Sequence, residues 1–211
     1  MQACYNETKH SILGGVMKQR KLSRQQVEQL ALLALLTAMV AVLAYFGGFI
    51  KIGGLASISL TLIPVVIGAA MCGPWAGAWL GAVAGAIFFA TADAAFWFGL
   101  SVPGTIITVL VKGALSGLCA GFAYKLLEKV NQYVAVIVSA IVCPVVNTGI
   151  FLLGCRIFFF DTVQSGAAGE GMSVFAYMII FFVGLNFVLE LLANIVLSPM
   201  ILRILNIGKK K

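Results

Sequence analysis

The feature that most constrains this chain is a long stretch with almost no charge. Between Leu30 and Val111 only Lys51 and Asp93 carry charged side chains. The 211 residues are 62% hydrophobic and 10% charged, whereas soluble domains average about 45–50% apolar and about 25% charged residues. A soluble fold of this length has too little interior to bury so much apolar surface. The sequence therefore predicts an integral membrane protein.

Six apolar segments are predicted to cross the membrane, because a spanning helix needs about 20 apolar residues. We expect helices over residues 23–46, 58–71, 75–92, 104–127, 133–160 and 172–205. The connections between them are predicted as loops, notably over residues 93–103 and 161–171. The expected fold is an all-α membrane bundle with three regions: a polar segment over 1–24, a six-helix membrane domain over 25–206 and a basic tail over 207–211.

The basic residues predict how the six spans are oriented. An even number of spans places both termini on one side, and eleven of the fourteen Lys and Arg residues fall on that side. Loops on the cytoplasmic side carry an excess of Lys and Arg. We therefore expect both termini to lie in the cytoplasm and the chain to sit in the cell membrane. The net charge of +7 is read as this orientation signal and not as nucleic-acid binding.

Small residues recur at every fourth position in three of the predicted spans. The third and fourth spans carry Gly73, Gly77, Gly81, Gly85, Gly113, Gly117 and Gly121. The first span carries a weaker version, made of Ala34, Ala38 and Ala41. Small residues at this spacing let two helices approach closely in lipid. The pattern favours packing between the third and fourth spans, and it leaves open the docking of another membrane protein.

Ionisable and amide side chains inside the spans are candidates for function, because a charge within the bilayer costs about 2.5–3.5 kcal/mol on insertion scales. Lys112 lies in the fourth span, and Asn147 and Arg156 lie in the fifth. Asn186 and Glu190 are four residues apart in the sixth, so they share one stripe of a helix. Two interpretations stay open for Lys112 and Glu190: they contact a ligand, or they neutralise each other as a structural ion pair.

The motifs of several enzyme classes are missing. The single histidine excludes an HExxH metal site, and neither a Walker A loop nor a dinucleotide-binding GxGxxG loop is present. A GxSxG nucleophile elbow is also missing. We therefore expect no enzyme activity, no cofactor and no metal. Because the polar residues do not run through the full depth of the spans, a channel is disfavoured. The remaining interpretation is a binding protein embedded in the bilayer.

Two segments resemble the substrate-binding (S) components of energy-coupling factor (ECF) vitamin transporters. Over residues 58–81, a helix ends in a Cys-Gly-Pro-Trp turn that leads directly into a glycine- and alanine-rich helix. Over residues 144–151, the run Pro-Val-Val-Asn-Thr-Gly-Ile-Phe resembles a fifth-helix signature of many family members. The resemblance extends over residues 30–205.

The resemblance implies a subunit that binds a water-soluble vitamin or related micronutrient for uptake. Such a subunit works with a transmembrane coupling subunit and two ATP-binding subunits, and it topples in the membrane to carry its site across. Lys112 or Arg156 could hold a carboxylate, so pantothenate is the favoured ligand. Folate, a queuosine precursor and cobalamin are alternatives. An alternative function is a non-transporting assembly subunit that docks a partner through its glycine and alanine ladders.

The resemblance also implies roles for particular residues. The expected ligand contacts are Asn147, Arg156, Asn186, Glu190, Lys112, Trp97 and Phe98. Trp97 has a second interpretation, as an anchor at the membrane interface. The expected lid over the ligand is the loop after the first span, with Gly47, Gly48, Lys51, Gly53 and Gly54. The expected docking residues for the coupling subunit are Ala34, Ala38 and Ala41.

Overall fold

The computed structural model describes residues 24–47, 51–52, 56–57 and 60–209 of the chain, with some side chains inside these ranges left out of the description. The chain divides into two units, Met1–Leu32 and Leu33–Lys211. The second unit holds all of the described residues except 24–32. The lid prediction falls partly outside the described residues, because Gly48, Gly53 and Gly54 are not among them.

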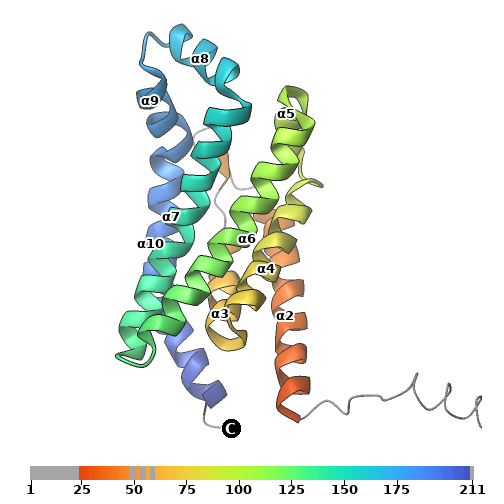
Figure 1. Ribbon diagram of the computed structural model, residues 1–211, viewed down its shortest axis with the longest axis vertical. Coiled ribbons are helices and arrows are strands. Elements are labelled where there is room, and N and C mark those ends of the chain that lie inside the picture. The colour runs from red at the N-terminus through yellow and green to blue at the C-terminus, as the bar shows by residue number, and fades with distance from the viewer. Residues whose placement is uncertain (1–23, 48–50, 53–55, 58–59, 210–211) are drawn as a thin grey trace, which may run out of the picture. The chain divides into compact units, whose positions relative to one another are not determined.

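The regular secondary structure of the described part is helical except for one pair of two-residue antiparallel strands. Figure 1 shows the elements, which follow one another as α2 (Arg24–Gly47), β1 (Lys51–Ile52), β2 (Ala56–Ser57), α3 (Leu62–Cys72), α4 (Pro74–Phe88), α5 (Ala92–Leu100), α6 (Val102–Leu127), α7 (Gln132–Phe158), α8 (Phe160–Gly169), α9 (Val174–Tyr177), the π-helix η1 (Met178–Val183) and α10 (Gly184–Lys209).

Three helices of the described residues are long and apolar enough to cross a membrane: Gln26–Phe46, Val102–Leu127 and Gln132–Phe158. The pair α4 and α5 adds a fourth span if the two helices, bent by 84° at their junction, are counted together. Helix α3 has 11 residues and is therefore about 16 Å long, against about 30 Å for the hydrocarbon core. The helical membrane fold is confirmed, whereas the count of six spans stays a prediction.

Two segments predicted as loops are helices, so both loop predictions are wrong. Helix α5 occupies most of residues 93–103, and α8 occupies most of residues 161–171. Both helices contain alanine, the best helix former. Each also has an aspartate in its first turn, Asp93 in α5 and Asp161 in α8. A carboxylate there interacts favourably with the positive end of the helix dipole.

The last predicted span, over residues 172–205, is interrupted. It is built from α9, the π-helix η1 and α10 in succession. The break falls at Gly184, where the π-helix η1 ends and α10 begins.

Helices α4 and α6 pack with their backbones in direct contact. Gly77 faces Gly117, and Gly81 faces Gly113. A Cβ added to any of these four glycines would collide with the carbonyl oxygen of the glycine opposite. Because no side chain separates the two helices at these positions, the prediction that the glycine-rich spans pack against each other is confirmed. We call this contact the glycine seam.

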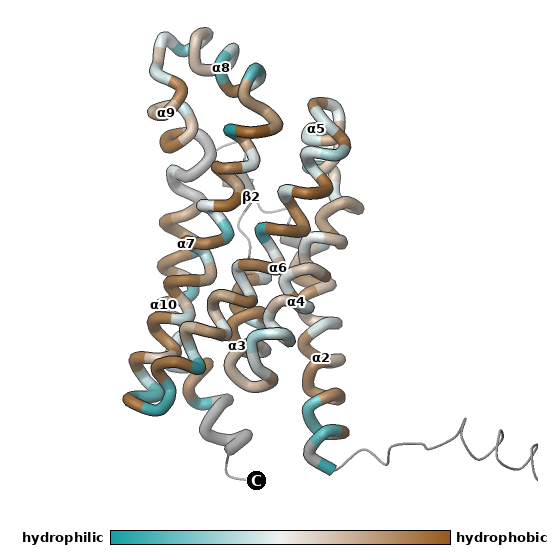
Figure 2. Tube along the Cα trace, in the orientation of Figure 1, coloured by the Kyte–Doolittle hydropathy of each residue, from teal (hydrophilic) through white to brown (hydrophobic). Residues whose placement is uncertain are grey.

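Polar residues mark the two ends of this unit. Figure 2 shows hydrophilic residues at the turn between α6 and α7 and again around α8, with largely hydrophobic helix between them. At the first of these ends, the Asn131 side chain accepts hydrogen bonds from the backbone N–H groups of Tyr133 and Val134 and so caps α7. Between the ends, the buried hydroxyl of Ser139 donates to the carbonyl oxygen of Ala120 at 2.9 Å and links α7 to α6.

Candidate ligand cavity

A cavity of about 80 Å³ lies among α2, α3, α4, α5, α6 and α7. One water molecule needs about 10–15 Å³, so the space holds several. Three small residues of α4, Gly81, Ala84 and Gly85, form part of its wall. The lining consists of Leu43, Ala44, Thr61, Leu62, Val65, Gly81, Ala84, Gly85, Phe88, Thr91, Asp93, Val109, Lys112, Gly113, Ser116 and Asn147.

Lys112 is the cation of the cavity. Together with Val109, Gly113 and Ser116 it lies on one face of α6, because these positions follow helical spacing. Its Nζ atom lies 5.0 Å from the centroid of the Phe151 ring and 5.8 Å from that of Phe88. Both distances are within the range of a cation–π attraction. The ammonium group is thus held between an aromatic ring of α7 and one of α4.

Glu190 acts on Lys112 without lining the cavity. Its side chain is buried in α10 at 3% exposure, and its carboxylate attracts the Lys112 ammonium. Asn194 and Ser198 follow at four-residue intervals and are also buried. Within the described part of the chain the Asn194 Oδ1 atom accepts no hydrogen bond. The predicted stripe on α10 therefore exists from Glu190 onward, while the side chain of Asn186 lies outside the description.

Asn147 supplies an amide to the cavity from α7. The side chain is half-buried and lines the cavity. Within the described part of the chain, its amide forms no hydrogen bond to another residue. Phe151 follows four residues later on the same face of α7, so that face brings both the amide and the Lys112-contacting ring to the site. An amide offers two N–H donors and one carbonyl acceptor to a ligand.

Asp93 is a charged cavity residue that the site prediction did not include. The sequence interpretation placed it in an outer loop, whereas it lies in the first turn of α5 and lines the cavity. One signal was available in the sequence, because Asp93 is the only acidic residue between Leu30 and Val111. A lone carboxylate in a long apolar stretch is a functional candidate by the same rule that singled out Lys112.

Hydrogen bonds and packing hold α5, and with it Asp93, in place. At the bend before α5, the Thr91 hydroxyl donates to the carbonyl oxygen of Phe88 at 2.7 Å. At the other end, the buried Thr105 hydroxyl of α6 donates to the carbonyl oxygen of Trp97 at 2.8 Å. Ala94, next to Asp93, is 1% exposed. The carboxylate therefore stands on a helix that is fixed at both ends.

Trp97 lies beside the cavity and outside its lining. Its ring makes edge-to-face contacts with Phe151 at 5.4 Å and with Phe159 at 5.2 Å between centroids. Trp97 thus supports the ring on which the Lys112 ammonium rests. Phe98 contacts Phe89 at 5.6 Å between centroids and is also outside the lining. Direct ligand contact by Trp97 or Phe98 stays a prediction.

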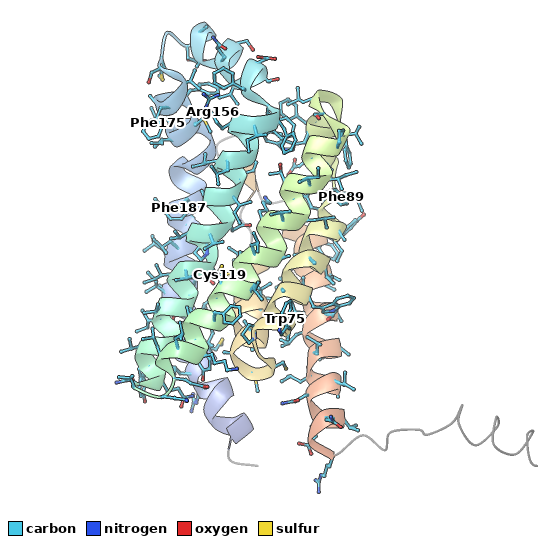
Figure 3. The ribbon with its side chains drawn as sticks, viewed as in Figure 1. Trp75, Phe89, Cys119, Arg156, Phe175 and Phe187 are labelled. Carbon is cyan, nitrogen blue, oxygen red and sulfur yellow. The ribbon has the colours of Figure 1, made fainter. Side chains whose placement is uncertain are left out.

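Arg156 is not brought to the cavity. Its side chain is exposed, and its guanidinium carbon lies 4.2 Å from the centroid of the Phe160 ring. Figure 3 shows it near the end of α7 next to α8. Arg156 follows Asn147 by nine residues, or about two and a half turns, so the two side chains leave opposite faces of α7.

The cavity brings an ammonium, a carboxylate and an amide together within largely apolar walls. Small-molecule sites in proteins have this composition, in which a few placed polar groups set the orientation of the ligand. The arrangement is suited to binding a small polar organic molecule inside the membrane protein.

Comparison with known families agrees with this geometry. A family model described as "ECF transporter, substrate-specific component" matches residues 28–202. The chain belongs to this family. The predicted membership among the S components is thereby confirmed, and the chain is a substrate-binding subunit of a transporter and not an enzyme. No curated protein and no solved structure matches the chain. The residues that match the S-component family include the whole cavity lining.

Proposed function

We propose that this S component binds a small, water-soluble vitamin-like micronutrient in the cavity and passes it on for uptake. The observation that carries the proposal is the meeting of Lys112 and Asn147 at one cavity, from two different helices. A cation is costly inside a bilayer and is expected to face a polar partner or a cavity. In a substrate-binding subunit, the partner that enters such a cavity is the substrate.

Pantothenate is the ligand that this site favours. Its carboxylate would meet the Lys112 ammonium, and its amide and hydroxyl groups offer partners to Asn147. Folate and cobalamin are larger molecules than pantothenate, so the cavity of about 80 Å³ has to widen more for them than for pantothenate. A queuosine precursor has no carboxylate for Lys112. These three remain the alternatives that a binding panel must include.

The proposed orientation in the cell membrane has six spans and both termini in the cytoplasm. At one end of the second unit, Figure 1 shows the turn between α6 and α7 near the last turns of α10. This end carries Lys125, Lys129 and Arg203, while Asp161 and Glu170 belong to the opposite end with α8. An excess of basic residues at one end supports its assignment to the cytoplasm.

Uptake is proposed to require a transmembrane coupling subunit and two ATP-binding subunits, with toppling of the S component in the membrane. Helix α2 supports the assignment of a docking surface, because Ala34 and Ala38 are exposed and Ala41 is half-buried. Small exposed residues at four-residue spacing allow close approach of a partner helix. The loop after α2 is proposed as the lid over the ligand.

A binding panel tests the proposed function. Purified protein is titrated calorimetrically with pantothenate, folate, cobalamin and 7-aminomethyl-7-deazaguanine, and pantothenate is expected to bind. Lys112→Gln is expected to weaken binding at least about tenfold, since hydrogen bonds to charged groups contribute about 1.5–3 kcal/mol. Lys125→Gln, which removes the same charge from an exposed position on α6, is expected to leave the affinity unchanged. If none of the four molecules binds detectably, the proposal is refuted.

A further inference from the structure

The cavity contains a negative group as well as a positive one. Asp93 of α5 and Lys112 of α6 both line it. We infer that Asp93 is a specificity-determining ligand contact, and that the ligand therefore has a hydrogen-bond-donating end, hydroxyl or amino, in addition to its anionic end. The inference rests on the proposed function and narrows the substrate class to small hydroxylated or amino-substituted carboxylates.

The charges around the cavity support this class. The Lys112 ammonium is attracted by the Glu190 carboxylate, which does not line the cavity, and Lys112 itself lines it. Asp93 lines the same space with a carboxylate, which accepts hydrogen bonds and donates none. A ligand with only an anionic group therefore finds a partner at Lys112 and none at Asp93. A ligand with a donor opposite its carboxylate finds a partner at both.

The Asp93 carboxylate is suited to this role by position and by chemistry. The hydroxyls of Thr91 and Thr105 hold the two ends of α5, so the helix that carries the carboxylate is positioned by the fold. A carboxylate has about four acceptor positions. It can therefore accept a hydrogen bond from a ligand while it keeps the contacts that it makes within the protein.

Two probes that differ only in their donors test the inference. One is pantothenate, and the other is its analogue without the two hydroxyls, 3,3-dimethylbutanoyl-β-alanine. The wild type is expected to bind pantothenate at least tenfold more tightly than the analogue. Asp93→Asn is expected to reduce this ratio at least fivefold. Asp161→Asn is the matched control, because it removes the same charge from the first turn of another helix, and it is expected to keep the ratio.

The outcomes separate this inference from the proposed function. If the wild type binds both probes equally, or if Asp93→Asn weakens both by the same factor, the inference is overturned and the proposed function stands. Binding only of vitamins that lack a donor or a carboxylate overturns it as well. If no vitamin binds, the proposed function fails first. Should Asp93→Asn not fold, Asp93→Ser, which keeps an acceptor in the first turn of α5, is measured in the same way and judged by the same ratio.

Discussion

Lys112 has two kinds of neighbour, which come from three helices. Phe88 of α4 and Phe151 of α7 offer the faces of aromatic rings, and Glu190 of α10 offers a carboxylate. A cation–π contact contributes about 0.5–2 kcal/mol, with the larger values at sites shielded from water. These neighbours explain how an ammonium is retained within a membrane bundle while it still faces a cavity.

A double-mutant cycle measures how strongly Lys112 and Glu190 depend on each other. Lys112→Met is expected to lower the free energy of unfolding by about 3 kcal/mol, because it leaves a buried carboxylate without its cation. The double variant Lys112→Met/Glu190→Gln is expected to recover more than half of that loss. The measurement is reversible unfolding of the purified protein in detergent. Glu190→Gln is measured alone as well. If the losses of the two single variants simply add in the double variant, the side chains are not coupled.

At the site, the sequence identified the ionisable and amide side chains within the spans, but it did not show which of them come together at one cavity. Lys112 and Asn147 were predicted as ligand contacts, and both line the cavity. Arg156 was grouped with them, although its nine-residue separation from Asn147 already places it on the opposite face of α7. The predicted contacts do not include Asp93, whose segment is predicted as a loop. Which helix faces which is a tertiary property, and a list of polar residues does not contain it.

Among the elements, the glycine seam makes the sharpest demand on side-chain size. Gly81→Ala is expected to destabilise the protein by about 1–3 kcal/mol, because the added methyl group overpacks the contact with Gly113. Gly149→Ala in α7 has open space around the new Cβ and is expected to stabilise by about 0.5–1 kcal/mol, since alanine is the better helix former. Thermal unfolding of both variants checks the difference. Equal effects would show that the seam is looser than described.

Long elements were predictable and short ones were not. The helices now seen as α2, α6 and α7 start and end within two residues of their predicted limits, because runs of more than 20 apolar residues leave little choice in lipid. Helices α5 and α8 have only 9 and 10 residues, and polar residues and glycines within them suggested loops. The π-helix before Gly184 carries no signature, because its residues are as apolar as those of an ordinary span.

On the scale of the whole transporter, substitutions on the exposed face of α2 test whether docking and ligand binding use separate surfaces. Ala38→Trp is expected to reduce co-purification with the coupling subunit at least about tenfold, because a bulky ring prevents the close approach of a partner helix. Met39→Trp, also exposed and one residue further along α2, is the matched control. Pantothenate affinity is expected to be unchanged in both variants. Equal co-purification of the two variants would place the docking surface elsewhere.

The glycine seam restricts where a ligand can enter or leave the cavity. Half of the cavity lining belongs to α4 and α6, and these two helices touch backbone to backbone, with no side chains between them that could rotate aside. We therefore expect this part of the cavity wall to be rigid. We therefore expect the ligand to enter or leave where α2, α3, α5 or α7 forms the boundary, because the glycine seam closes the wall between α4 and α6.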